Sequence, residues 1–239
     1  FSGSVAISTT QAMCVYVVFD VTTSANNAET VQIEISSPAN DVGVSAGSVS
    51  PSTPIAISGT TTLAGPVITQ SGYHWRNDTG IETAALSATG GVENTIVTDH
   101  SANTPIRLRL ALSNEGAASS VSTAYRLEFG PRVTTCSAVS VWTPVGDATD
   151  DWNMYDSSNL THGNDTTNIA VANGGITDPN LTFIASNAGI RDTTSTSSAL
   201  VMSTTEFAEY EFSITSTNIT GFNTTYCFRL TNNGQPLTY

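Results

Sequence analysis

Short runs of apolar residues that alternate with polar ones recur along most of this chain. In residues 106–112, for example, Ile106 and the leucines alternate with Arg107, Arg109 and Ala111. Successive side chains of a strand point to opposite faces, so this pattern predicts an antiparallel strand with a buried leucine face and a solvent-facing arginine face. Residues 207–214 repeat the pattern less regularly, and we find no helical period of useful length.

Clusters of Gly, Pro, Asn and Ser separate these runs, as expected for turns between short strands. The predicted fold class is therefore all-β: one or two antiparallel β-sandwiches with the general architecture of immunoglobulin domains. A true immunoglobulin domain is not expected, because Tyr226 directly precedes Cys227 whereas the tyrosine corner lies two residues before its cysteine. The predicted strands are 11–21, 30–36, 54–58, 67–75, 105–113, 121–129, 138–142, 182–186, 207–216 and 224–231.

The first ten residues are uncharged and contain no proline, and the first eight alternate in character. One face of this segment carries Phe1, Gly3, Val5 and Ile7. Such a strand either fills an edge of its own sheet or inserts into a groove of a neighbouring subunit as a donor strand. In the second case the head-to-tail contact does not close, and a filament results.

Composition changes near residues 65–66. Residues 1–66 hold four acidic residues and no basic one, and every arginine, histidine and tryptophan lies beyond them. We therefore expect an N-terminal β segment, residues 1–66, which includes the candidate donor strand 1–10. A larger β-sandwich domain, residues 67–239, should follow it.

Charge and residue usage exclude several function classes. Charged residues make up 11% of the chain, the net charge is −13, and all seven basic residues are arginine. Nucleic acids are bound by clustered basic side chains, so neither nucleic acid nor an anionic membrane is an expected partner. The absence of lysine excludes pilus assembly through a lysine ε-amine and intramolecular Lys–Asn isopeptide bonds.

No apolar run has the length of a membrane span, so membrane insertion is not expected. The chain begins with Phe1 rather than Met, which fits either a secreted protein that has lost its signal peptide or a sequence trimmed at that point.

The three cysteines give an odd count. Cys136 precedes one predicted strand and Cys227 lies inside another, so we expect these two to form a disulfide within the larger domain. Cys14 lies in an apolar predicted strand, where it is either a small buried hydrophobe or one half of an intersubunit disulfide.

Five stretches of the larger domain form a recognisable pattern: GYHWRNDTG at 72–80, IRLR at 106–109, SNEG at 113–116, YRLEFG at 125–130 and TYCFRLT at 225–231. The pattern resembles a module found in predicted surface proteins of uncultivated prokaryotes. This resemblance covers residues 72–233 and implies an extracellular β-rich architecture without an assigned enzymatic activity. It also favours the pairing of Cys136 with Cys227. The chain is similar in character to secreted filament subunits that assemble by strand exchange, and it lacks the hydrophobic N-terminal helix of type IV pilins.

Two acidic groups have a chemical and a structural interpretation. Glu206, Glu209 and Glu211 resemble paired glycosidase acids only if they flank a sugar cleft, and we interpret them as the exposed face of a strand. The loop that begins at residue 146 offers carboxylates to calcium, with a solvated acidic loop as the alternative. The calcium candidates are Asp147, Asp150 and Asp151.

Two enzyme-like patterns lack their structural context. Residues 43–47 match Gly-x-Ser-x-Gly, but no helix is predicted after them, as a nucleophile elbow requires. The three histidines, His74, His100 and His162, lie far apart and match no zinc spacing. We therefore predict no catalytic residue, no metal requirement and no cofactor.

Six asparagines lie in N-glycosylation sequons, and with so many Ser and Thr residues about this number is expected by chance. Trp75, Trp142 and Trp152 are candidates for a sugar-binding platform, with core packing as the alternative. The sequons are at Asn77, Asn159, Asn164, Asn180, Asn218 and Asn223.

Two function hypotheses result. The first is a structural subunit of an extracellular filament or cell-surface assembly, a homopolymer joined noncovalently by its N-terminal strand. The second is a carbohydrate-binding or adhesive β-sandwich module of a larger surface protein, with glycans or cell surfaces as partners.

Overall fold

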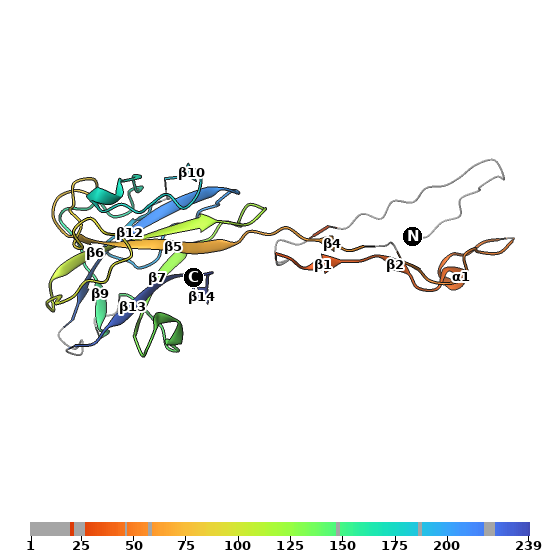
Figure 1. The fold of residues 1–239 in the computed structure, drawn as a ribbon, viewed down its shortest axis with the longest axis horizontal. Coiled ribbons are helices and arrows are strands. Elements are labelled where there is room, and N and C mark those ends of the chain that lie inside the picture. The colour runs from red at the N-terminus through yellow and green to blue at the C-terminus, as the bar shows by residue number, and fades with distance from the viewer. Residues whose placement is uncertain are drawn as a thin grey trace.

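The computed structural model describes residues 20–21, 27–45, 47–56, 59–146, 149–185, 188–217 and 223–239. The described residues are nearly all β, and the longer strands form two sheets that face each other in a sandwich (Figure 1). The predicted all-β, sandwich-like fold is confirmed. The only helices in these ranges are α1 (Pro38–Asp41) and two 3-10 turns, Cys136–Ala138 and Val171–Asn173.

The first sheet has the strand order β10-β12-β6-β5, and β11 and β9 also pair with β12. The β5–β6 and β6–β12 pairs are antiparallel, whereas β10 and β11 run parallel to β12. The strands are β5 (Ile68–Asn77), β6 (Pro105–Asn114), β9 (Trp152–Met154), β10 (Thr182–Phe183), β11 (Ile190–Arg191) and β12 (Glu206–Ser216).

The second sheet has the order β14-β13-β7-β8, and all of its pairs are antiparallel. It consists of β7 (Tyr125–Pro131), β8 (Thr143–Pro144), β13 (Tyr226–Asn232) and β14 (Gln235–Pro236). Its inner face meets that of the first sheet, and the Trp75 and Phe228 rings touch across the interface with centroids 5.3 Å apart. The leucines of β6 lie in this core, as their alternation predicts.

Residues 27–65 form an arm that projects from the sandwich (Figure 1). Among the described residues of the arm there are two separate ladders: β1 (Thr30–Val31) pairs with β4 (Thr61–Thr62), and β2 (Glu34–Ile35) pairs with β3 (Ile55–Ala56). At the base of the arm Ala117 donates its N–H to the Gly65 carbonyl. The two segments approach so closely that a Cβ on Gly116 would lie 2.3 Å from that oxygen. Only glycine fits there.

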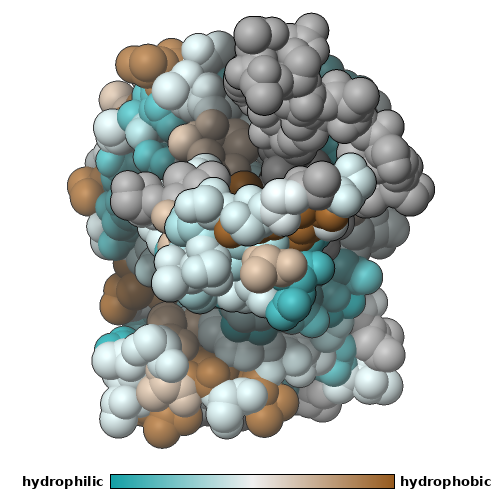
Figure 2. Space-filling view, turned by 90° about the vertical axis from the view of Figure 1, so that its right-hand side faces the viewer, coloured by the Kyte–Doolittle hydropathy of each residue, from teal (hydrophilic) through white to brown (hydrophobic). Residues whose placement is uncertain are grey.

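The described residues of the arm are almost all at least partly exposed. Among its described residues only Pro38 and Gly65 are buried, and the cross-strand pair Ile35 and Ile55 is exposed. Figure 2, which views the molecule from the side of the arm, shows mostly pale polar residues with brown apolar ones between them.

Several strand predictions differ from the structure. The predicted strand 138–142 is wrong, because the chain after Cys136 makes a 3-10 turn and the Trp142 indole donates to the Val139 carbonyl at 3.1 Å, which holds the segment in a local turn. The single strand predicted over 30–36 is two short strands, β1 and β2. The strand predicted at 121–129 starts only at Tyr125. Residues 11–19 of the first predicted strand lie outside the described residues.

Candidate functional site

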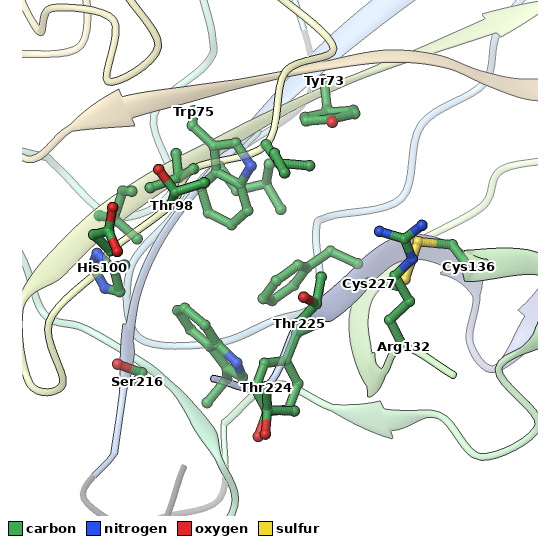
Figure 3. Close-up of a pocket in the computed structure, with 18 of the residues that line it drawn as sticks. Tyr73, Trp75, Thr98, His100, Arg132, Cys136, Ser216, Thr224, Thr225 and Cys227 are labelled. Carbon is green, nitrogen blue, oxygen red and sulfur yellow. A yellow bond between two sulfur atoms is a disulfide. The ribbon is translucent and has the colours of Figure 1, made fainter. Parts of the chain in front are cut away.

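A cavity of about 780 Å³ lies between the two sheets at the side of the sandwich where β5 and β13 are the nearest strands (Figure 3). Its floor is apolar, formed by Leu108 and Leu110 of β6 together with Trp75 of β5. Trp152 and Phe228 form a further aromatic wall, with their ring centroids 5.1 Å apart. Residues 96–102 line the side away from β13.

The cavity opens toward solvent past the start of β13. Its rim residues Arg132, Thr224 and Thr225 also line a second groove of about 420 Å³, so the two spaces adjoin at these residues. In Figure 3, Tyr73 and Trp75 lie across the cavity from Thr225 and Cys227.

One edge of β13 faces this cavity without a neighbouring strand at Phe228. Arg132 donates its backbone N–H to the Thr225 carbonyl. In an antiparallel pair every second residue hydrogen-bonds to the partner strand, so Thr225 and every second residue after it point their backbone groups toward β7. The N–H and C=O of Phe228 therefore point to the opposite edge, and among the described residues no partner occupies them. In contrast, β14 covers this edge at Thr231 and Asn232.

The open part of the edge ends at Leu230. The Leu230 N–H donates to Gln70 Oε1 at 2.7 Å, and the Tyr239 hydroxyl donates to the Leu230 carbonyl at 2.7 Å. These contacts agree with the direction of the alternation, and they occupy the backbone groups of the strand edge at Leu230.

The other edge strand, β5, is already covered. Ala88 donates its N–H to the Trp75 carbonyl and Asn94 donates to the Tyr73 carbonyl. An additional strand placed beside the cavity could therefore hydrogen-bond to β13 at Phe228, whereas the Tyr73 and Trp75 carbonyls of β5 are already occupied.

No family model, curated protein or solved structure matches this chain. None of the helices in the described ranges has the length and apolar character needed to cross a bilayer.

The predicted disulfide between Cys136 and Cys227 is present, and both cysteines lie at the rim of the cavity. The donor-strand residues Phe1, Gly3, Val5 and Ile7 lie outside the described residues, as does Cys14, so their placement stays a prediction.

The calcium candidates do not form a described cation site. Asp147 lies outside the described residues, and the Asp151 carboxylate accepts a hydrogen bond from the Tyr226 hydroxyl at 2.8 Å. Within the described ranges, no group of three or more His, Cys, Asp or Glu side chains is arranged to hold a metal ion.

The prediction that Arg107 and Arg109 on β6, and Glu209 and Glu211 on β12, face solvent is wrong. All four are completely buried. The loops after β5 and before β10 fold over this outer face, and they contribute Glu82, which accepts from Arg109 Nη1 at 2.8 Å, and the Thr167 carbonyl, which accepts from Arg109 Nη2. The resulting buried charge cluster consists of Arg76, Arg107, Arg109, Asp78, Glu82, Glu209 and Glu211.

Glu211 is the centre of the buried charge cluster. Its carboxylate pairs with Arg76, with Arg109 at 2.7 Å and with Arg107 at 3.4 Å. Burial disfavours the charge on Arg109, but Glu211, Glu209 and Glu82 together hold its pKa above the ordinary value. Burial raises the pKa of the Glu209 carboxyl, against the opposing effect of Arg109.

Glycosidase acids must flank an open cleft. Glu209 and Glu211 instead lie beneath loops with their carboxylates bound to guanidinium groups, while Glu206 is half-buried and accepts the Ser203 N–H. This arrangement is that of an internal structural cluster.

The three histidines and three tryptophans have separate environments. His74 is buried and hydrogen-bonds the Gly175 carbonyl and Ser87, and His162 pairs with Asp192 at 2.7 Å. His100 stacks on Trp152 at the cavity. Trp75 and Trp152 line the cavity, whereas Trp142 lies under the Arg229 guanidinium, so the three tryptophans do not form one platform.

The sequons differ in accessibility. Asn77, Asn164 and Asn223 are exposed, and Asn218 lies outside the described residues. The side-chain amides of Asn159 and Asn180 donate to the Asp78 and Asn114 carbonyls, so a glycan there would first have to break these bonds.

Glu128 on β7 should make stability pH-dependent. Burial alone would raise the pKa of its carboxyl, but Arg126 at 2.6 Å and Arg229 at 2.9 Å hold it below the ordinary value. A depressed folded pKa stabilises the protein above the unfolded pKa of about 4.3, and this contribution is lost as the pH falls through the folded pKa. In urea titrations from about pH 6 to 2.5, Glu128→Gln should flatten the acid-side loss of unfolding free energy. Equal slopes in the two proteins would contradict this role.

Proposed function

We propose that this protein is a structural subunit of an extracellular filament or cell-surface assembly, and that identical subunits are joined noncovalently by donation of the N-terminal strand. The arm carries the proposal. Two-stranded ladders are marginally stable in water, and each ladder of the arm pairs only two residues per strand. With only Pro38 and Gly65 buried among its described residues, the arm needs apolar contacts from outside the sandwich. A neighbouring subunit would supply them.

Two further properties support this proposal. Disulfides are typical of oxidising, extracellular environments, and this chain contains the Cys136–Cys227 bond. The net charge of −13 makes identical subunits repel at low ionic strength, so assembly should be favoured by added salt.

The test removes residues 1–8 and compares the product with the intact protein by negative-stain microscopy. We expect filaments from the intact protein and folded monomers from the deletion. A double variant, Val5→Asp with Ile7→Asp, should also stay monomeric because its apolar face carries charge. Ser4→Thr on the opposite face is the matched control and should assemble. Normal filaments from the deletion would exclude strand donation by this segment, and an intact protein that stays monomeric in high salt would exclude the filament itself.

A carbohydrate-binding function is the second candidate, because aromatic side chains line the cavity. Binding to a glycan array that disappears in Trp152→Ala, in a protein that forms no filaments, would favour it over the assembly function.

A further inference from the structure

The cavity between the sheets is too large for a packed protein interior. Cores pack as densely as organic crystals, with few voids larger than a water molecule. A space of about 780 Å³ lined by Trp75, Leu108, Leu110 and Phe228 is instead the size of a ligand site. An apolar occupant would complete this core.

The backbone next to the cavity favours a strand as that occupant. The N–H and C=O of Phe228 point toward the open edge of β13, and the inward side chains of β13 line the same space. A β-strand added here would satisfy the edge with its backbone and fill the cavity with alternate side chains.

We infer that the occupant is residues 1–8 of a second copy of this chain, paired with β13 at Phe228. This inference rests on the proposed function and adds the acceptor site to it. The segment is uncharged, matching a cavity whose charged residues, Asp99 and Arg132, lie among polar rim residues. Its alternation places Phe1, Gly3, Val5 and Ile7 on one face, which is the period that an inward-facing strand requires.

The length of the segment also fits. The edge from Cys227 to Arg229, centred on Phe228, spans roughly 10 Å at about 3.3 Å per residue, and seven residues of donor span roughly 23 Å. Because Leu230 is closed off by Gln70 and Tyr239, the remainder of the donor must leave past Thr225. The groove that adjoins the cavity at Thr225 offers the path.

The experiment measures binding of a synthetic, C-terminally fluorescein-labelled peptide of residues 1–8 to the protein that lacks those residues. Fluorescence anisotropy should show saturable binding. Thr98→Trp places an indole into the cavity from its exposed wall and should weaken binding at least tenfold, whereas the matched control Thr98→Ser should not. A peptide with Val5→Asp and Ile7→Asp should not bind.

The same substitutions in the intact chain separate this inference from the proposed function. Thr98→Trp should prevent filaments and Thr98→Ser should allow them. Filaments from Thr98→Trp, or equal peptide binding by the two variants, would place the acceptor elsewhere and leave the assembly function standing. Peptide binding together with an intact protein that sediments only as a monomer would mean that the segment fills its own cavity, which overturns the second copy. If no peptide binds at all, the cavity is not the acceptor.

Discussion

Glu211→Gln should lower the free energy of unfolding by about 3–5 kcal/mol, the usual cost of leaving buried charges without their partner. Glu211 and its three arginine partners, Arg76, Arg107 and Arg109, are all completely buried. The glutamine keeps the shape and part of the hydrogen bonding but removes the negative charge. Arg107 keeps its ion pair with Asp78 at 2.7 Å, and Arg109 keeps its pairs with Glu82 and Glu209, whereas the Arg76 guanidinium loses the carboxylate with which it forms its ion pair. Urea unfolding at neutral pH measures the change.

Glu206→Gln is the matched control for this prediction. Glu206 begins the same strand, β12, but is only half-buried, and its carboxylate accepts a single backbone N–H from Ser203. A surface substitution of this kind should cost less than about 1 kcal/mol. Similar small losses in both variants would mean that the buried charge cluster contributes no more to stability than a surface group does.

Replacing both Cys136 and Cys227 with serine should lower the free energy of unfolding by about 2–5 kcal/mol. The bond joins residues 91 positions apart, so it strongly restricts the unfolded chain. It also holds the loop after β7 against β13 at the rim of the cavity. Urea unfolding with and without a reductant measures the effect.

The intact protein in reductant should behave like the double serine variant, and the variant itself should not respond to reductant. Cys14→Ser keeps the bond and should retain the full response. If reductant leaves unfolding of the intact protein unchanged, the bond does not stabilise the fold.

The alternation of residues along the strands predicted where β6, β12 and β13 lie but not which faces meet water. A period of two shows that Arg107 and Arg109 share a face, and it is silent on what covers that face. Here long loops bury it. A usable signal was present: Arg107 and Arg109 repeat at the same two-residue spacing as Glu209 and Glu211, which suits opposite charges on neighbouring strands.

The disulfide between Cys136 and Cys227 was predicted correctly, although the run after Cys136 that supported the prediction is a turn and not a strand. The cavity was not. Its lining comes from segments far apart in sequence, including Trp152 on β9, a strand of three residues that is too short to show a period. The gap between β5 and β13 also depends on sheet order, which no local pattern specifies.

The use of arginine as the only basic side chain, together with its burial, limits which proteases can cut the folded chain. Trypsin-like enzymes need a lysine or arginine that fits into their active site, and all seven such residues lie in the described ranges. Arg76, Arg107, Arg109 and Arg191 are buried and Arg126 and Arg229 are half-buried within strands, which leaves Arg132 as the exposed one. A cut after Arg132 would leave Cys136 and Cys227 together in the C-terminal fragment, so the disulfide would not link the two fragments. The pairing of β6 with β12 and of β7 with β13 would instead hold them together. Native digestion should therefore give a nicked protein that stays folded, and its two fragments should separate on a denaturing gel with or without a reductant.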